Sequence, residues 1–440
     1  MGRKKARRRK VSISNKILLL LCGLYFIAYV DRVNIATAAP FIEDDLNLSS
    51  SQMGFILSAF AYPYCFLQIA GGWAGDKLGP RKMLSVIGIV VAGTTAITGA
   101  ISGMWSAMLA RIGLGVGEGA AFPTATKAMT KWLPREKWGF GQGVTHASSR
   151  LGNAITPPLI AAIIVSLGWR SSFFIMALIT ALWVVVWLWY FRDNPNNHPK
   201  ITNEELAALP PQSDTTEKKE KKEKKVIPWK QLSKRILPIT LIDFCYGWAL
   251  WVYLTWLPSF LYTAYQIDIQ KSAIFTAGIL FAGVIGDALG GGLSDKIYKR
   301  TNNLKFARKS VLVTGLAGSF IFLLPALFVH NLALIAISLS LAFFFLELCN
   351  ANLWAIPMDI APNHSGTASG MMNTGFGIAG MVSPLLFGFM IDVTGNWQVP
   401  FSASIILLFV GIVVTLFIDP SKKVDLADSD EENIKSTTSI

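Results

Sequence analysis

The sequence predicts an all-α membrane protein in which twelve transmembrane helices form two six-helix bundles that are parallel repeats. Three observations carry this prediction. Hydrophobic residues make up 52% of the 440 residues and charged residues only 15%, whereas soluble domains carry about 25% charged residues. The apolar residues come in blocks of about twenty, the length that spans a bilayer. Motifs of the first half of the chain recur in the second half.

The apolar blocks give twelve candidate spans. They cover residues 16–41, 53–75, 83–102, 104–129, 140–166, 171–191, 236–262, 273–293, 310–329, 332–357, 367–391 and 398–418. The first span is too long for a signal peptide and has no small-residue cleavage site after it. We therefore expect it to remain as the first helix.

Basic residues mark one side of the expected membrane. They gather in the tail 1–10, in the connections 76–82, 131–137 and 295–309, and in the segment 192–235, whereas the connection 41–52 is acidic. By the positive-inside rule we expect both termini in the cytoplasm and the chain in the cell (inner or plasma) membrane. The net charge of +13 is then a topology signal. Every basic cluster adjoins a span, so the expected contact is anionic lipid and not nucleic acid.

The segment between the two halves is polar and highly charged. It contains "DNPNNHPK" and "PPQSDTTEKKEKKEKK", a composition typical of a solvated, flexible linker. The expected organisation is a basic tail (1–15), an N-terminal bundle (16–191), a cytoplasmic linker (192–235), a C-terminal bundle (236–418) and a C-terminal tail (419–440). We expect a monomer.

Three motif pairs relate the halves. They are "GGWAGDK" (71–77) with "GGGLSDK" (290–296), "TAAPF" (37–41) with "TWLPSF" (255–260), and "GVTHASSRLGNAITPP" (143–158) with "GMMNTGFGIAGMVSPL" (370–385). Their offsets are similar and their order is the same. Two parallel repeats suit alternating access, in which two bundles rock about a site at their interface.

These motifs resemble those of the major facilitator superfamily. "GGWAGDKLGPRK" (71–82) matches the superfamily's cytoplasmic motif between helices 2 and 3, and "GGLSDKIYKR" (291–300) is a weaker second copy. We interpret the two copies as a cytoplasmic gate of the outward-open state, not as substrate chemistry. The gate residues are Gly72, Asp76, Lys77, Gly79, Arg81, Asp295 and Lys296.

Further motifs narrow the resemblance. "DRVNIATAAPFI" in helix 1, "RIGLGVGEGAAFPTATKAM" (111–129) in helix 4 and "SRLGNAITPPL" (149–159) in helix 5 are similar to the anion:cation symporter family of sugar-acid, aromatic-acid, sialic-acid and glutamate carriers. The resemblance implies proton-coupled uptake of organic carboxylates.

Charges within the predicted spans are few and therefore informative. A charge at the bilayer centre costs a few kcal/mol unless it is paired or hydrated, so each is a functional hypothesis. The simplest assembly places five of them around one polar cavity. These are Asp31 and Arg32 in helix 1, Arg111 and Glu118 in helix 4, and Arg150 in helix 5.

The cavity so assembled has three arginines and two carboxylates. A surplus of guanidinium groups favours an anionic substrate, because arginine can bind a carboxylate with two hydrogen bonds. The structural alternative is that the charges are ion pairs that hold helices 1, 4 and 5 together. That alternative explains a pair better than an unmatched third arginine.

Proton coupling follows from the same charges. A carboxylate that loses its arginine to a substrate becomes easier to protonate, so proton and anion binding favour each other. The family resemblance implies that Asp31 and Glu118 are proton sites and that Arg111 binds the substrate carboxylate. Arg32 is expected to exchange partners with Glu118.

Arg150 departs from family members that carry monoanionic sugar acids, which often have a neutral residue in this region. Its repeat counterpart is Gly377. We hypothesise that Arg150 meets a second negative group and favours a dicarboxylate or an aromatic diacid. His146, one turn away on the same face, and Ser149 complete this group; His146 is otherwise an ordinary hydrogen-bonding residue.

Neutral groups are expected to complete the substrate site. The candidates are Tyr64 in helix 2, Trp251 in helix 7, Asn350 in helix 10 and Asn373 in helix 11. Trp251 is equally consistent with packing or a lipid contact. Asp287 and Glu347 are candidates for a second proton site.

The predicted function is proton-coupled uptake of a small organic anion such as a sugar acid, dicarboxylate or aromatic carboxylate. The alternatives are an organic-anion or phosphate-ester exchanger and, more remotely, a non-transporting membrane sensor. No nucleophile–base set, metal cluster or nucleotide loop occurs in the sequence, so we expect neither an enzyme nor a cofactor or metal site, only the proton as driving ion.

Overall fold

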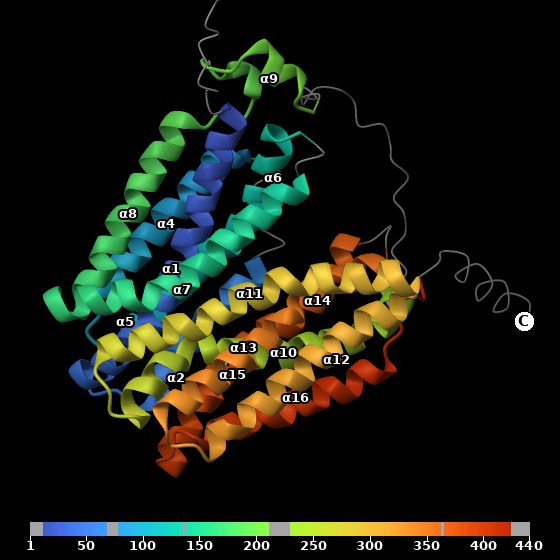
Figure 1. The fold of residues 1–440 in the computed structure, drawn as a ribbon. Coiled ribbons are helices and arrows are strands. Elements are labelled where there is room, and N and C mark those ends of the chain that lie inside the picture. The colour runs from blue at the N-terminus through green and yellow to red at the C-terminus, as the bar shows by residue number, and fades with distance from the viewer. Residues whose placement is uncertain (1–11, 68–77, 135–137, 211–228, 362–364, 424–440) are drawn as a thin grey trace, which may run out of the picture.

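The fold is a pair of helical bundles, described by a computed structural model over residues 12–67, 78–134, 138–210, 229–361 and 365–423 (Figure 1). The N-terminal half contains α1 (Ile13–Leu46), α2 (Ser50–Ala59), α4 (Pro80–Gly99), α5 (Met104–Gly119), α6 (Ala121–Trp132), α7 (Trp138–Leu167) and α8 (Trp169–Tyr190). The C-terminal half contains α10 (Trp229–Ala264), α11 (Ile269–Thr301), α12 (Leu304–Leu323), α13 (Leu332–Leu348), α14 (Asn350–Ile360), α15 (Ser365–Thr394) and α16 (Val399–Phe417).

Where the structure describes them, all twelve predicted spans coincide with helices, which confirms the all-α prediction. Within the described residues, ten segments are long and apolar enough to cross a membrane. The spans predicted at 53–75 and 104–129 are not among these ten; residues 68–75 of the first lie outside the described residues, and in both segments a helix ends four residues before a proline. Pro63 and Pro123 have no N–H to donate to the carbonyls of Ala59 and Gly119, where α2 and α5 end.

The two halves meet closely at the end of the bundles where α1 joins α2. A Cβ on Gly54 would lie 2.7 Å from the carbonyl oxygen of Pro384, and one on Gly388 would collide with the carbonyl of Ser50. The Asp392 carboxylate also accepts hydrogen bonds from the N–H groups of Ser50 (3.1 Å) and Ser51 (2.8 Å). These contacts close this end, which we call the non-basic end.

At the opposite end, which carries the basic connections and which we call the basic end, the halves diverge (Figure 1). Arg150 on α7 still reaches the C-terminal half through ion pairs. His146 lies one turn nearer the basic end on the same face of α7, and it is exposed. The halves therefore separate within one helical turn of Arg150.

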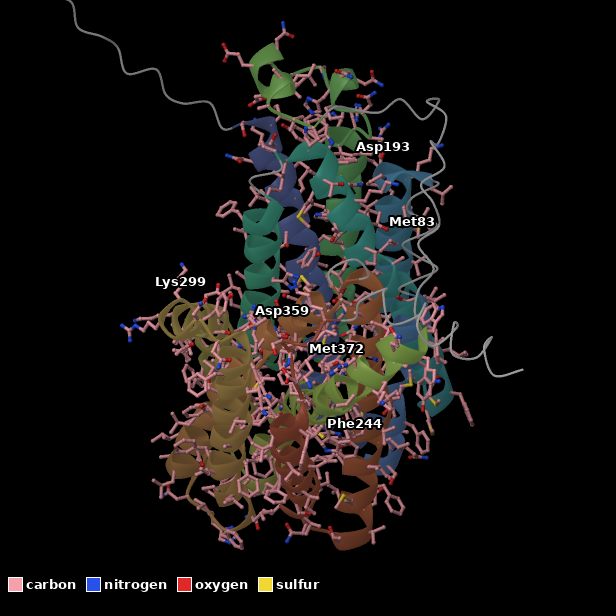
Figure 2. All side chains as sticks on the ribbon, turned by 90° about the vertical axis from the view of Figure 1, so that its right-hand side faces the viewer. Met83, Asp193, Phe244, Lys299, Asp359 and Met372 are labelled. Atoms are coloured by element: carbon pink, nitrogen blue, oxygen red, sulfur yellow. The ribbon has the colours of Figure 1, made fainter. Side chains whose placement is uncertain are left out.

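The predicted gate motifs lie at the basic end. Gly72, Asp76 and Lys77 fall outside the described residues. Gly79 precedes α4 with a φ of 80°, which favours glycine. The next turn is fixed by Asp193, which follows α8 and accepts a hydrogen bond of 2.9 Å from the N–H of Arg81; Figure 2 shows Asp193 beside the start of α4.

In the second copy of the gate motif, the acid Asp295 is not the main ion-pair partner of the nearby arginine. The Asp295 side chain is 69% exposed, and its carboxylate oxygen lies 3.7 Å from Nη1 of Arg308 on α12, too far for a hydrogen bond. Lys296 is exposed. Arg308 instead binds Asp359 of α14 at 2.9 Å and the Ser294 hydroxyl at 2.9 Å. Asp359, which Figure 2 labels, is therefore the main partner of this arginine.

Part of the predicted linker is folded. It contains η2 (Pro195–Asn197) and α9 (Asn203–Ala207), and Glu205 of α9 accepts a hydrogen bond from the N–H of Ile13 at the start of α1. His198 is buried with its ring edge-on to Trp132 and Tyr190. This burial lowers the pKa of His198, which favours the neutral ring. Residues 192–210 thus pack on the N-terminal half, whereas 211–228 lie outside the described residues.

We predict that Gly388→Ala opens the non-basic end, because the new methyl group collides with the Ser50 backbone. Overpacking of this kind costs about 1–3 kcal/mol. Distances between spin labels at positions 47 and 396, measured by double electron–electron resonance, should lengthen. Gly278→Ala, whose Cβ meets no atom within 4 Å, is the matched control. Equal distances in both variants would contradict the packing account.

Candidate functional site

Four of the predicted charged residues converge inside the N-terminal half. Asp31 and Arg32 lie in the middle of α1, and Arg111 and Glu118 lie two turns apart on α5. Their exposed fractions are 3%, 6%, 2% and 1%. The Nε of Arg32 donates to a Glu118 carboxylate oxygen at 2.6 Å. None of the four faces lipid.

The glycines of α5 explain how this helix approaches its neighbours so closely. A Cβ on Gly115 would collide with the carbonyl of Phe60, and one on Gly119 would lie 3.2 Å from the carbonyl of Tyr64. Gly117 faces α4 instead, where a Cβ would lie 2.9 Å from Val91. Small residues at this spacing permit backbone contact within a bilayer. The charged face of α5 is therefore packed against α1 and against residues 60–67, which follow α2.

Aromatic rings surround the Arg32 guanidinium. Its central carbon lies 4.5–5.3 Å from the ring centroids of four residues: Tyr29, Phe60, Tyr64 and Phe122. The Arg111 guanidinium lies 4.9 Å from the same Phe60 ring. Cation–π contacts partly replace the lost hydration of a buried cation. The predicted site residue Tyr64 therefore holds Arg32 in place through its ring, which stacks on Phe60.

Several polar atoms of this cluster have no hydrogen-bond partner. They include both carboxylate oxygens of Asp31, the second oxygen of Glu118, Nη2 of Arg32 and Nε of Arg111. The Thr95 hydroxyl of α4 is near Asp31 and completes no hydrogen bond either. Buried polar atoms are normally satisfied. Unused donors and acceptors so close together are suited to binding protons or a polar ligand.

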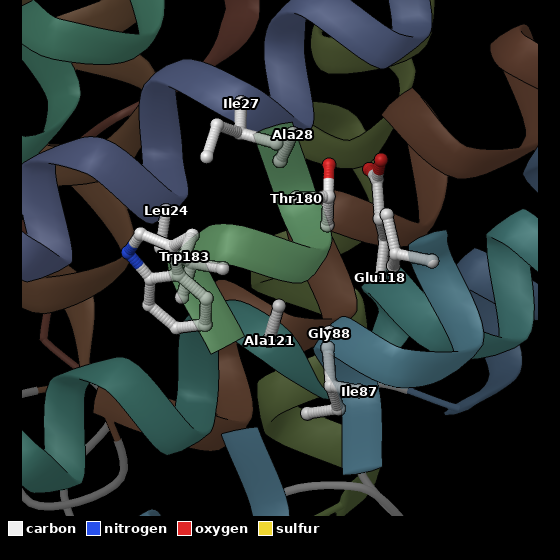
Figure 3. A pocket seen from close by; sticks show the side chains of 10 residues that line it. Leu24, Ile27, Ala28, Ile87, Gly88, Glu118, Ala121, Thr180 and Trp183 are labelled. Carbon is white, nitrogen blue, oxygen red and sulfur yellow. The ribbon is translucent and has the colours of Figure 1, made fainter. Parts of the chain in front are cut away.

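Glu118 also lines a small cavity (Figure 3). Its volume is about 10 Å³, which is enough for about one water molecule. Apart from Glu118 and Thr180 it is lined by apolar groups of α1, α4, α6 and α8, including Leu24, Ile87 and Trp183. This cavity is inside the N-terminal half and is too small for an organic substrate.

Arg150 does not join this cluster, contrary to the expectation of one cavity with five charges. Its Nε lies 3.2 Å from Asp287 of α11, and its Nη2 lies 3.0 Å from Glu347 of α13. The prediction of an unmatched third arginine was therefore wrong, because acids of the other half compensate it. The two clusters together contain three arginines and four carboxylates. There is therefore no surplus of arginine, and the argument that such a surplus favours an anionic substrate fails.

The remaining predicted residues divide between the interface and local packing. Asn350 donates to Asp287 at 3.0 Å, so it belongs to the Arg150 cluster. The Trp251 ring is buried, lies near Phe60, and donates through Nε1 to the Phe376 carbonyl, which favours its packing interpretation. Ser149 donates to the carbonyl of His146 in its own helix.

Two predicted residues remain accessible at the basic end. His146 is exposed, its ring lies edge-on to Tyr25, and it is within electrostatic range of Arg150 and Asp287. Asn373 on α15 is half-buried. Both therefore stay candidates for contact with a ligand that enters between the halves.

One buried acid was missed by the sequence analysis. Asp243 of α10 is 3% exposed and accepts a hydrogen bond of 3.1 Å from the N–H of Phe376 on α15. Its position inside the apolar span 236–262 was the available signal. It connects two of the closely packed helices of the C-terminal half, where Figure 2 labels the neighbouring Phe244 and Met372.

We predict that Arg32→Lys destabilises the N-terminal half. A lysine cannot combine the Nε contact to Glu118 with the planar stacking against four rings. The loss should be about 1–3 kcal/mol, measured by thermal unfolding of the purified protein in detergent. Arg300→Lys, on an exposed residue of α11, is the control. Equal melting temperatures for both variants would contradict the cation–π account.

Known proteins match the chain over most of its length. The family model described as Major Facilitator Superfamily matches residues 21–307 and 303–439. A probable sulfoacetate transporter of Cupriavidus necator is 48% identical and the alignment covers 96% of this chain and 97% of the relative. A hexuronate transporter of Bacillus subtilis is 32% identical, with 92% and 94% covered.

Solved structures agree with the family at the level of the fold. The crystal structure of a D-xylose–proton symporter superposes with a TM-score of 0.74 at 14% identity, covering 94% of this chain and 100% of that chain. The relatives and the fold are those of transporters and not of enzymes. The chain belongs to the major facilitator superfamily and is a multi-pass membrane transporter whose relatives carry sugar acids and other organic anions.

Proposed function

We propose that the chain takes up a small organic anion together with protons by alternating access between its two halves. The observation that carries the proposal is the buried contact of Arg32 with Glu118, beside Arg111 and an Asp31 carboxylate with no hydrogen-bond donor. Such a group has guanidinium donors for an anion and acids that can take up protons. Its components come from two helices of one half, α1 and α5.

The proposed coupling is a competition for arginine. While Glu118 is ionised it holds Arg32. A proton on Glu118 weakens this ion pair and releases the guanidinium for the carboxylate or sulfonate of the substrate. Arg111, which has no ion-pair partner within 4 Å among the described residues, is the second anion-binding group. Asp31 is a further proton acceptor, so that protons and anion are bound together.

The membrane orientation belongs to the same proposal. The basic end faces the cytoplasm by the positive-inside rule, and both termini lie there. The structure then represents a state closed by Ser50, Gly388 and Asp392 on the outer side and open toward the cytoplasm near His146. The expected location is the cell (inner or plasma) membrane, with the chain as a monomer.

The substrate is proposed to carry two negative groups. The relative with 48% identity is described as a probable sulfoacetate transporter, and sulfoacetate joins a sulfonate to a carboxylate. Arg150 supplies a third guanidinium at the interface, and its side chain is 13% exposed. Tyr29 is in contact with Arg32 and within electrostatic range of Arg150, so the two arginine clusters are near enough to act on one small molecule.

We predict that proteoliposomes containing the protein accumulate sulfoacetate when the outside is more acidic, and take up less acetate, which has one charge. D-glucarate and galactonate are measured in parallel, so that the uptake rates of sugar acids can be compared with that of sulfoacetate. Arg150→Gln should reduce uptake of the dianions by about tenfold or more, as expected for a loss of about 1.4 kcal/mol or more of binding energy. No uptake of any of these anions under a pH gradient would overturn the proposal.

A second prediction separates symport from exchange. Glu118→Gln should abolish net uptake driven by the pH gradient while leaving counterflow of labelled sulfoacetate, because counterflow needs no net proton movement. Asp268→Asn, which alters an exposed acid before α11, is the control. Gradient-driven uptake that is unchanged in Glu118→Gln would contradict the proposal that Glu118 is a coupling proton site.

A further inference from the structure

The cluster at the interface of the halves contains more acid than base. It joins Arg150 of the N-terminal half to Asp287 and Glu347 of the C-terminal half, with Tyr246 and Asn350 beside them. If both acids were ionised, one negative charge would be buried without compensation, which is strongly unfavourable. The balanced arrangement has one proton on one of the two acids.

The hydrogen bonds distinguish the two acids. Both oxygens of Asp287 have donors, Arg150 at 3.2 Å and Asn350 at 3.0 Å, and its side chain is 20% exposed. Glu347 is completely buried, and only one of its oxygens has donors, from Arg150 at 3.0 Å and the Tyr246 hydroxyl at 3.1 Å. Its other oxygen has no partner. The proton therefore belongs on Glu347.

Among the residues that the structure describes, the surroundings of Glu347 add no further cation. The charged and titratable groups that interact with it are Arg150 from α7, Asp287 from α11 and Tyr246 from α10, with Cys349 adjacent on its own helix. Asp243 of α10 interacts with Tyr246, which adds a further acid. His146 of α7 lies toward the exposed side of Arg150 and Asp287. Arg150 is thus the only cation among these groups.

We propose that Glu347 and Asp287 together form a second, anion-linked proton site, at which the transported anion competes with the two acids for Arg150. When an anion draws Arg150 away, Glu347 keeps its proton and the ionised Asp287 loses its counter-charge, so a proton from the aqueous space between the halves bonds to a carboxylate oxygen of Asp287. When the anion leaves, Arg150 returns and the proton is released to water. The ion pairs of the structure then represent the state after anion release.

This proposal rests on the proposed function, which supplies the anion, and it adds one coupled proton to each transport cycle. It differs from the Glu118 site in place and in partners. Glu118 exchanges Arg32 within the N-terminal half, whereas Glu347 and Asp287 exchange an arginine that belongs to the other half. Proton binding at this pair of acids is therefore linked to the contact between the halves.

The direct test requires no transport. Infrared difference spectra of the purified protein without anion, between about pH 6 and pH 10, should show loss of the carbonyl band of a protonated carboxyl group. Glu347→Gln should lack its share of the band, while Glu118→Gln and the exposed control Asp268→Asn retain it. A band of equal size in wild type and Glu347→Gln would overturn the proposal.

Asp287→Asn gives a second, independent outcome. In this variant Arg150 and Glu347 balance each other, so Glu347 should ionise and its band should disappear although the residue is still present. A purely structural role of the cluster predicts no such loss. Persistence of the Glu347 band in Asp287→Asn would contradict the charge balance.

The transport consequence is measured with sulfoacetate as the probe. The reversal potential of uptake in proteoliposomes should correspond to one proton fewer per anion in the double variant Glu347→Gln/Asp287→Asn than in wild type, because neither residue can then take up a proton, and an unchanged ratio would overturn the coupling. The two proposals can fail separately. If wild type transports none of the tested anions, the proposed function fails while the infrared result stands; if it transports them and the spectra are unchanged, only the Glu347 site fails.

Discussion

The rest of the structure depends on one constraint, that a guanidinium group in the middle of a membrane bundle requires both a counter-charge and a substitute for its water. Arg32 meets the requirement with Glu118 and a set of aromatic rings. Arg150 meets it with two acids from the opposite half. Removal of either partner would leave a buried charge unpaired, and because each arginine has a carboxylate that an anion could replace, these pairs are suited to coupling.

Helix packing provides the geometry that this constraint needs. The glycines of α5 bring its charged face against residues 60–67, and α2 and α5 each end four residues before a proline, Pro63 and Pro123. Gly54 and Gly388 close the non-basic end at backbone distance. The positions of the small residues and the prolines thus account for closure at the non-basic end and access from the basic end. The charged clusters lie between these two ends.

The fold could be predicted almost completely from the sequence, because the length of apolar blocks and the repeated motifs are direct consequences of a bilayer and of a duplicated bundle. The convergence of Asp31, Arg32, Arg111 and Glu118 was also predictable, since helical spacing places Arg111 and Glu118 on one face. The partners of Arg150 were not. Asp287 and Glu347 were recognised as unusual, but no spacing rule relates residues of different halves. The folded part of the linker was missed because its contacts, such as Glu205 with Ile13, are tertiary.

The central claim, that anion and proton compete for the same buried arginines, is tested most directly by counting protons when an anion binds. Sulfoacetate would be added to the detergent-solubilised protein in weakly buffered solution containing a pH-sensitive dye. The account predicts that protons are taken up as the anion binds, and that uptake falls in Glu118→Gln. Saturating binding of sulfoacetate without any proton uptake, at several starting pH values, would contradict it.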